Sequence, residues 1–284
     1  MNLLITGGAG FIGSNFIRYI LQTYPNYLVI NYDSLTYAGS LSNISDFQKY
    51  PNYFFIKGDI RNKELVAKTV LAHKINCIIN FAAETHVDRS ISNPTLFVET
   101  NVCGTCNLLE AALKYHISKY IQISSDEVYG SSNMQSFTEN SPLLPNSPYS
   151  ASKAGADVLV RSYNKTYDLP VNIVRSSNNY GQYQHTEKFI PKMITNALKN
   201  KPLPLYGDGL HIRDWLHVRD NCSAIDLVLH KGLTGEIYNI GGCSERTNLE
   251  VAKYILKYLR KSNDLINYTK DRLGHDRRYS VNCN

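Results

Sequence analysis

Two side chains four residues apart, Tyr149 and Lys153, could together remove a proton from a substrate hydroxyl. On a helix, residues at this spacing lie on one face, so the phenol and the ammonium would be neighbours. A nearby cation lowers the pKa of a phenol, so that the phenolate form becomes available as a base. This base can take the proton of a substrate hydroxyl while the carbon that bears the hydroxyl loses a hydride. Tyrosine and lysine at this spacing also occur on ordinary half-exposed helices, so the pair needs support from its surroundings.

That support comes from a hydroxyl and two carboxyls, Ser125, Asp126 and Glu127, which directly follow a predicted strand. Ligands of open parallel sheets bind where the carboxyl ends of the strands meet, so these groups are expected to face the same crevice as Tyr149. Two adjacent carboxyls repel each other's charge, which can hold one protonated while the other stays ionised. The sequence therefore predicts an acid and a base beside a hydride carrier.

The hydride carrier is predicted from three glycines, Gly7, Gly10 and Gly13, which follow an apolar strand and open a helix. Such a turn lets a pyrophosphate approach backbone N–H groups and the positive end of the helix dipole. The second predicted strand ends at Asp33, where a carboxylate can bind the diol of a ribose. No basic residue follows at 34–36 to receive a 2′-phosphate, so NAD is favoured over NADP.

Two further strand ends are expected at the same crevice, Asp59–Ile60 and Ala82–Ala83. Small side chains at 82–83 would let a cofactor lie against the backbone, although such a pair is also routine packing.

These groups need a fold that gathers strand ends, and the hydrophobic periodicity predicts one. Apolar, β-branched runs predict strands at Leu3–Thr6, Leu28–Tyr32, Phe54–Lys57, Cys77–Phe81, Tyr120–Ser124 and Val171–Arg175. Three- and four-residue apolar spacing predicts helices between them at Phe11–Thr23, Lys63–His73, Leu96–Tyr115 and Tyr149–Tyr167. The expected fold is α/β, a doubly wound parallel sheet of the Rossmann type.

The second part of the chain is expected to be a smaller substrate-binding lobe. After about residue 178 the pattern loosens into Asn-, Pro- and Gly-rich loops, with helices at Ile190–Asn200 and Leu249–Arg260 and a strand at Ile237–Ile240. We therefore predict an NAD-binding domain over 1–177 and the lobe over 178–284.

Composition narrows the class of protein. The 284 residues are 43% apolar and 19% charged, which is typical of an ordered soluble domain. Neither a signal peptide nor a membrane-spanning run is found, so a cytoplasmic, non-membrane protein is predicted. The net charge is +6, and residues 253–278 hold eight basic and three acidic side chains. Without a DNA-binding motif, that excess favours a phosphorylated small ligand over nucleic acid.

The cysteines and histidines suggest no further chemistry. The six cysteines are scattered, which favours reduced thiols, and Cys103-x-x-Cys106 lies inside an amphipathic stretch, where packing is the simpler explanation. His86 and His275 lack the paired spacing of a metal site, so no metal is expected.

Longer motifs give the chain a resemblance to a known family. TGGAGFIG and Tyr149-x-x-x-Lys153 resemble the extended short-chain dehydrogenase/reductase family. Finer motifs resemble its dTDP-glucose 4,6-dehydratase subfamily across essentially the whole chain: LTYAG at 35–39, AAETHVDRSI at 82–91, SSDEVYG at 124–130, SPYSASKA at 147–154, SNNYG at 177–181, EKFIP at 187–191, PLPLYGDG at 202–209, IRDW at 212–215, YNIGG at 238–242 and DRLGHDRRY at 271–279.

The resemblance implies a reaction and roles. Tyr149 would take the proton of the sugar 4-hydroxyl as carbon 4 is oxidised by NAD. Glu127 would then remove the proton of carbon 5, Asp126 would protonate the departing 6-hydroxyl, and carbon 6 would receive the hydride. Ser125, where the family more often has threonine, would hold the sugar, and Thr85 stands where a serine is usual.

The resemblance also implies the rest of the site. Implied cofactor residues, beyond the glycines, are Phe11, Ile12, Asp33, Ser34, Leu35, Thr36, Asp59, Ile60, Ala82, Ala83, Thr100, Tyr149, Lys153 and Asn179. Implied substrate residues are Thr85, Ser125, Asn178, Lys188, Phe189, Pro204, Leu205, Tyr206, Arg213, Asn248, Asp271, Arg272 and His275. The cations among them suit a nucleotide diphosphate. A homodimer formed through 96–115 and 149–167 is a further expectation, as is a role in polysaccharide synthesis.

Two alternatives stay open at this stage. A UDP-glucose 4-epimerase-like enzyme would share the fold, but epimerisation needs neither a base for carbon 5 nor an acid for the 6-hydroxyl, so Asp126 and Glu127 favour dehydration. Family members usually continue past the DRLGHDRRY segment, whereas this sequence stops at Asn284. A shortened NAD-binding protein without turnover is therefore the second alternative.

Overall fold

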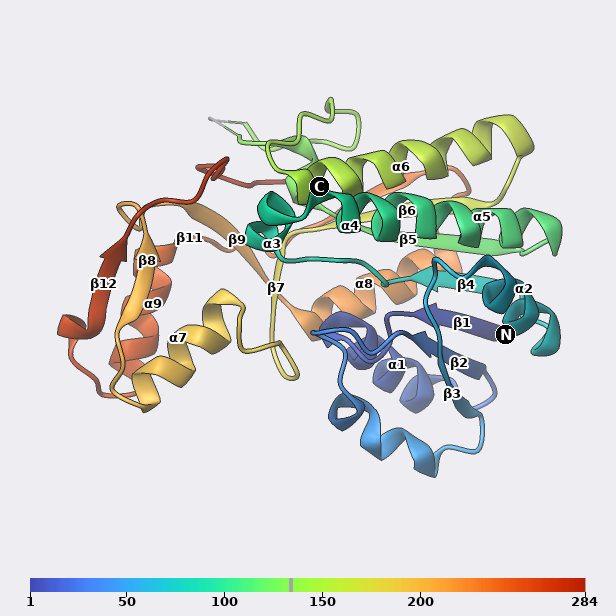
Figure 1. Ribbon diagram of the computed structural model, residues 1–284, viewed down its shortest axis with the longest axis horizontal. Helices are drawn as coiled ribbons and strands as arrows, with labels where there is room; N and C mark the ends of the chain where they lie inside the picture. The colour runs from blue at the N-terminus through green and yellow to red at the C-terminus, as the bar shows by residue number, and fades with distance from the viewer. Residues whose placement is uncertain (133–134, 284) are drawn as a thin grey trace.

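The computed structural model describes residues 1–132 and 135–283, and its centre is a seven-stranded parallel sheet (Figure 1). The strand order is β10-β6-β5-β4-β1-β2-β3, with the chain reversing direction across the sheet between β1 and β4. The strands are β1 (Asn2–Thr6), β2 (Leu28–Asp33), β3 (Tyr53–Lys57), β4 (Cys77–Asn80), β5 (Lys119–Ser125), β6 (Val171–Ser176) and β10 (Ile237–Ile240). The predicted doubly wound fold is confirmed.

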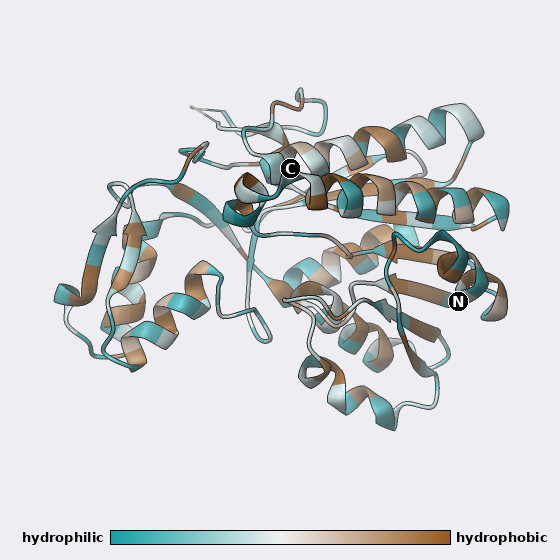
Figure 2. Cartoon of the chain, in the orientation of Figure 1, coloured by the Kyte–Doolittle hydropathy of each residue, from teal (hydrophilic) through white to brown (hydrophobic). Residues whose placement is uncertain are grey.

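Apolar side chains on both faces of these strands explain why the sheet is buried. In β1, Leu3 and Ile5 join one core cluster while Leu4 joins the other, and none of the three is exposed. Parallel pairing sets Leu4 opposite Ile30 and Ile78. A strand buried on both faces needs apolar residues throughout rather than in alternation, and the central strands are accordingly hydrophobic in Figure 2.

Helices cover each face of the sheet. One face carries α1 (Phe11–Thr23), α8 (Val218–Lys231) and the 3-10 helix η1 (Leu41–Lys49). The other carries α2 (Lys63–Ala72), α5 (Gly104–Lys114) and α6 (Pro148–Tyr167). Both α1 and α6 begin at the end of the sheet where β1 and β5 finish, so their first turns face the predicted site.

The helix predicted over Leu96–Tyr115 is present in the structure, where it contains a π-helical segment. It consists of α4 (Pro94–Phe97), a π-helical segment η2 (Val98–Cys103) and α5, preceded by α3 (Val87–Ser92). The buried Asn101 amide on η2 accepts from the Glu84 N–H at 2.8 Å and donates to the Ser152 hydroxyl at 2.8 Å. The wider turn thus ties the segment after β4 to α6, and such turns often occur at functional sites.

The lobe is built from small sheets and two helices. A three-stranded sheet has the order β11-β9-β7 and a two-stranded sheet the order β12-β8. Leu203, Leu205 and Met193 form its core with Ala252 and Leu256. The elements are β7 (Asn178–Tyr180), α7 (Phe189–Leu198), β8 (Leu203–Tyr206), β9 (Ile212–His217), β11 (Glu245–Thr247), α9 (Asn248–Tyr258), the 3-10 helix η4 (Asn263–Leu265) and β12 (Ile266–Thr269).

The chain crosses between the two parts more than once. Although β10 and α8 follow residue 178, β10 pairs with β6 and α8 packs against α1, so both elements belong with the large sheet. Among the described residues, no helix combines the length and the apolar character that a membrane crossing requires.

Candidate active site

A cavity of about 710 Å³ opens at the carboxyl ends of the central strands, between the large sheet and the lobe. It brings together most of the predicted site residues. From the cofactor set it is lined by Gly7, Gly10, Phe11, Ile12, Gly13, Asp33, Ser34, Thr36, Asp59, Ile60, Ala82, Ala83, Thr100 and Asn179. From the catalytic and substrate sets it is lined by Tyr149, Lys153, Ser125, Asp126, Glu127, Thr85, Asn178 and Lys188.

The glycine loop forms a cradle at one end of this cavity. Gly7 has a φ of +68°, and a Cβ there would lie 2.6 Å from the backbone nitrogen of Ala82. A Cβ at Gly13 would lie 2.4 Å from the carbonyl oxygen of Gly7, so α1 could not pack so closely on β1. α1 begins after Gly10 with neither a side-chain cap nor an acidic residue in its first turn. Its first N–H groups are therefore available to an anion.

Asp33 lies beside this cradle, at the end of β2. Its two carboxylate oxygens accept from the backbone N–H groups of Ala9 at 2.9 Å and Leu35 at 2.7 Å, which orients the carboxylate. Each oxygen keeps a lone pair for a further donor such as a ribose hydroxyl. Leu35 adopts a φ of 54° and packs on the core instead of lining the cavity. The cradle, the uncapped helix and this carboxylate fit a dinucleotide such as NAD.

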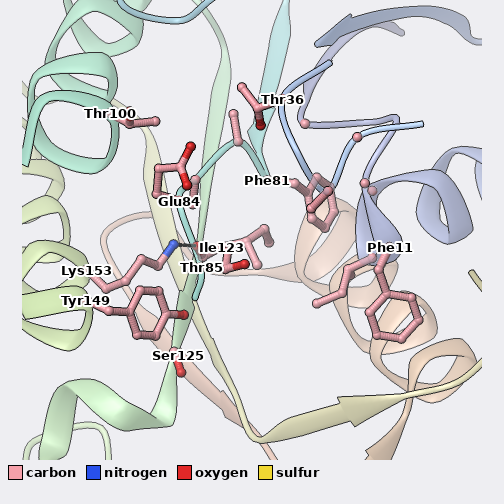
Figure 3. Close-up of a pocket in the computed structure, with 18 of the residues that line it drawn as sticks. Phe11, Thr36, Phe81, Glu84, Thr85, Thr100, Ile123, Ser125, Tyr149 and Lys153 are labelled. Carbon is pink, nitrogen blue, oxygen red and sulfur yellow. Dashed lines mark hydrogen bonds between the residues drawn. The ribbon is translucent and has the colours of Figure 1, made fainter. Parts of the chain in front are cut away.

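Tyr149 and Lys153 project from α6 into the same space, with Ser125 beside the phenol and Phe11 across the cavity (Figure 3). Lys153 donates to the carbonyl oxygen of Ile123 at 2.5 Å, and burial lowers the pKa of its ammonium to about 8. The expected lowering of the tyrosine pKa is wrong for this structure. Burial and then the charge of Glu127 raise the pKa of Tyr149 above its usual range.

Burial raises the pKa of both neighbouring carboxyls. Asp126 is buried, and burial together with the charge of Glu127 raises its pKa to about 8. The hydroxyl of Ser125 donates to its Oδ1 at 3.2 Å, while Oδ2 has no partner. Burial also raises the pKa of Glu127, but Arg272, Arg213 and Lys188 oppose the rise. The charge of Glu127 thus favours the neutral form of Asp126, while the three cations favour the ionised form of Glu127 against the effect of burial.

Those three cations come from separate segments that converge near Glu127. Lys188 precedes α7, and its ammonium donates to the Thr85 carbonyl at 2.9 Å. Arg213 on β9 is buried, donates to the Asp276 carbonyl at 3.0 Å and lies over the Tyr279 ring. Arg272 has a buried Nε without a hydrogen-bond partner, 4.0 Å from Asp88. An anion such as a phosphate would give this Nε a hydrogen-bond partner.

The remaining predicted substrate residues lie in the lobe, outside the residues that line the cavity. Leu205 is fully buried in the lobe core, and Phe189 stacks on Trp215. Tyr206 donates to Asp88 at 3.1 Å, which places it at the mouth between the two parts. The others form the neighbouring surface of the lobe: Pro204 on β8, Asn248 at the start of α9, and Asp271 with His275 in the loop after β12. Their roles stay predictions.

Some lining residues were not predicted. Glu84 follows Ala83 in the cavity, and burial raises the pKa of its carboxyl. Tyr37 lies there too, with its hydroxyl 3.2 Å from that of Thr85. Both residues belong to motifs that the sequence analysis identified, LTYAG and AAETHVDRSI. Treating every polar residue of these motifs as a candidate would have included them.

Comparison with known proteins agrees with this geometry. The sequence model of the family described as GDP-mannose 4,6 dehydratase matches residues 4–282. The chain belongs to this family.

Several relatives cover almost the whole chain. It is 52% identical to the low-salt glycan biosynthesis protein Agl12 of Haloferax volcanii, over 100% of this chain and 90% of the relative. It is 48% identical to the dTDP-glucose 4,6-dehydratase of Haemophilus influenzae, again over 100% and 90%. The crystal structure of dTDP-glucose 4,6-dehydratase from Bacillus anthracis in complex with NAD aligns with a TM-score of 0.93 and 55% identity, over 100% of this chain and 88% of that one.

An epimerase shares the fold at lower identity. The UDP-glucuronic acid 4-epimerase of Bacillus cereus aligns with a TM-score of 0.94 but is 28% identical, over 99% of this chain and 90% of that one. Backbone shape therefore does not separate dehydratases from epimerases, and the distinction must come from side chains.

Proposed function

We propose that the protein is an NAD-dependent dTDP-glucose 4,6-dehydratase, which converts dTDP-glucose to dTDP-4-dehydro-6-deoxy-glucose and water. The observation that carries the proposal is the pair of adjacent carboxyls, Asp126 and Glu127, which line the cavity together with Tyr149 and whose pKa values are both raised by burial. Relatives named as dTDP-glucose 4,6-dehydratases at 48% and 55% identity support the same reaction.

The cofactor end of the cavity prepares the first step. NAD, when bound, would accept a hydride from carbon 4 and return it to carbon 6. The glycine cradle and the start of α1 would hold its pyrophosphate, and Asp33 a ribose. We assign to Tyr149 the removal of the proton from the sugar 4-hydroxyl, and to Lys153, beside it on α6, a contact with the cofactor.

The carboxyl pair accounts for the loss of water. Once carbon 4 is a ketone, the proton on carbon 5 is acidic, and the ionised Glu127 accepts it. The neutral Asp126 gives its proton to the departing 6-hydroxyl, which leaves as water. Carbon 5 is then protonated from the enzyme as carbon 6 is reduced, so that the product keeps the oxidation level of the substrate. Ser125 positions Asp126 through its 3.2 Å hydrogen bond.

The rest of the site belongs to this proposal. Residues 1–177 would provide most of the dinucleotide site and 178–284 most of the nucleotide-sugar site, with β10 and α8 completing the large sheet. Lys188, Arg213 and Arg272 would bind the diphosphate. A cytoplasmic homodimer that serves polysaccharide synthesis is part of the proposal on the strength of the family resemblance.

Isotope labelling tests the reaction. The purified protein is incubated with NAD⁺ and dTDP-glucose in deuterated water, and the sugar is followed by NMR. Dehydration places solvent deuterium on carbon 5 of a 4-keto product, because Glu127 exchanges its proton with solvent. A galactose-configured product without that label would support the epimerase instead. Folded, NAD-bound protein that forms no product would overturn the proposal.

A further inference from the structure

Two cysteines that take no part in the proposed reaction lie close together at the surface, Cys243 and Cys283. Cys243 belongs to the loop between β10 and β11, and Cys283 follows the isolated bridge that Val281 forms with Phe137. Both residues are exposed and both thiols are free. They are far apart in the sequence, so only the fold makes them neighbours.

The loop that carries Cys243 is anchored on both sides of that residue. The Asp214 carboxylate on β9 accepts from the N–H of Gly242 at 2.7 Å and from the N–H of Ser244 at 2.6 Å. The N–H of Trp215 donates to the Ser244 carbonyl at 3.2 Å. Between these anchors Cys243 has a φ of 47°, and its side chain stays exposed. The backbone bonds therefore fix the position of Cys243.

The segment that carries Cys283 lies against the same loop. The bridge from Val281 to Phe137 holds this segment in place. Beyond it, the Sγ of Cys283 lies over Gly241, where a Cβ would be only 2.6 Å from the sulfur. The missing side chain at Gly241 thus makes room for the Cys283 thiol, two residues from Cys243.

The two thiols interact with each other. Burial, and then the charge of Cys243, raise the pKa of Cys283 to about 11, and a hydrogen bond between the two side chains contributes to the rise. The sulfur atoms of a disulfide are about 2.05 Å apart, so thiols at hydrogen-bond distance need to approach by only about 2 Å. Small movements of two exposed side chains can therefore join Cys243 to Cys283.

We propose that Cys243 and Cys283 form a redox-active dithiol, which low-molecular-weight disulfides such as oxidised glutathione convert to an intramolecular disulfide. The bond fastens the segment that carries Tyr279, whose hydroxyl donates to Glu127 at 3.3 Å, to the loop after β10. The inference does not depend on the proposed dehydratase activity. Oxidation of the thiols can therefore fail while the activity holds, and the reverse.

The reaction proceeds by two thiol–disulfide exchanges. A thiol attacks as its thiolate, and little of Cys283 is ionised near neutral pH, so we assign the first attack to Cys243. Cys243 displaces one glutathione thiol and forms a mixed disulfide. The sulfur of Cys283 then attacks the sulfur of Cys243 and displaces the second glutathione. The protein dithiol loses two electrons and two protons, which reduce one oxidised glutathione to two thiols.

Thiol counting with peptide mapping provides the test. Reduced full-length protein at low concentration is incubated with oxidised glutathione, its free thiols are counted after denaturation, and its peptides are analysed by mass spectrometry without reduction. We expect the loss of two thiols per chain and a linked pair of peptides that contains Cys243 and Cys283. No loss of thiols, a stable glutathione adduct on Cys243, or a link between other cysteines or between chains would overturn the proposal.

Three variants locate the reaction. Cys243→Ser should lose thiols more than about tenfold more slowly, because only the weakly ionised Cys283 remains. Cys283→Ser should stop at the mixed disulfide and retain one glutathione per chain. The matched control is Cys103→Ser, which removes another exposed cysteine and should leave the oxidation unchanged. Wild-type oxidation in Cys243→Ser, or an equal slowing in the control, would contradict the proposal.

Discussion

The two ends of the cavity are built by different means. At the dinucleotide end, Gly7–Gly13 and Asp33 belong to one β-α-β unit, and the cradle consists largely of backbone groups. At the proposed sugar end, Lys188 lines the cavity, and Arg213 and Arg272, from two other segments, lie outside its lining and act on Glu127 through their charge. A backbone cradle is specified by short motifs and tolerates little change, whereas a charge cluster depends on the tertiary fold and can be weakened one residue at a time.

The carboxyl pair lies where these two ends meet, and the largest effect is expected beside it. Tyr149→Phe removes the hydroxyl that transfers the proton, so kcat should fall about 10²–10⁴-fold while bound NAD is retained. Steady-state kinetics and the NAD content after gel filtration provide the measurement. Tyr163→Phe, a change on the same helix whose hydroxyl bonds Glu110, is the matched control. Comparable losses in both variants would show that α6 matters for stability and not for chemistry.

At the dinucleotide end, Gly7→Ala should disrupt the cradle. A residue with a Cβ at a φ of +68° is strained by about 1–2 kcal/mol, and this Cβ would also contact the backbone at Ala82. We expect NAD affinity to fall at least about tenfold with a lower Tm, measured by calorimetric titration and thermal unfolding.

The control for that variant is Gly155→Ala, since Gly155 lies inside α6 with the side chain of Val102 as the nearest neighbour of a new Cβ. Alanine is the better helix former, so NAD affinity should be unchanged. Normal NAD binding by Gly7→Ala would remove the contrast between the two ends.

At the sugar end, Arg272→Gln should act on the substrate alone. Removing one cation from the cluster is expected to raise KM about tenfold and to leave NAD affinity unchanged, because the cradle contains no part of that residue. Arg277→Gln removes an exposed arginine paired with Asp208 and serves as the control. A loss of NAD affinity in Arg272→Gln would mean that the two ends are coupled.

The smallest expected effect is a dependence of kcat and of stability on pH. Because the pKa of Asp126 is about 8, the acid form prevails below that pH, and kcat should fall progressively as the pH rises above it. The raised pKa of Asp126 also determines how the stability of the fold changes with pH. Between the ordinary value of 3.8 and about 8, the folded state binds a proton that the unfolded state has released, so rising pH destabilises the fold. Denaturant titrations of wild type and Asp126→Asn should differ in this slope.

The difference between the ends also explains what could be predicted from the sequence. The helix at Phe11–Thr23 and the glycine turn follow from local periodicity and turn chemistry, and the structure has that helix with the same bounds. The π-helical segment of the helix at 96–115 carries the tertiary hydrogen bonds of Asn101, which hydrophobic periodicity cannot predict. Helix α8 was missed although Val218, Cys222 and Ile225 carry the apolar spacing that could have revealed it.

The strand at Ile237–Ile240 was predicted with its bounds but was grouped with the lobe, because a sequence does not state which strand it pairs with. The same limit applies to Cys243 and Cys283, which are neighbours only in the fold. The effect of the Glu127 charge on Asp126 could be anticipated because the two carboxyls are adjacent in sequence, whereas their burial depends on the fold.

In the proposed reaction, Glu127 acts only after carbon 4 has been oxidised. A rapid-mixing experiment with dTDP-glucose and NAD-loaded Glu127→Gln, followed through the absorbance of reduced nicotinamide, tests it most directly. We expect reduced cofactor to accumulate in Glu127→Gln, because the proton of carbon 5 cannot be removed, and not to form in Tyr149→Phe. Wild-type turnover by Glu127→Gln, or no reduced cofactor in a folded, NAD-bound variant, would contradict it.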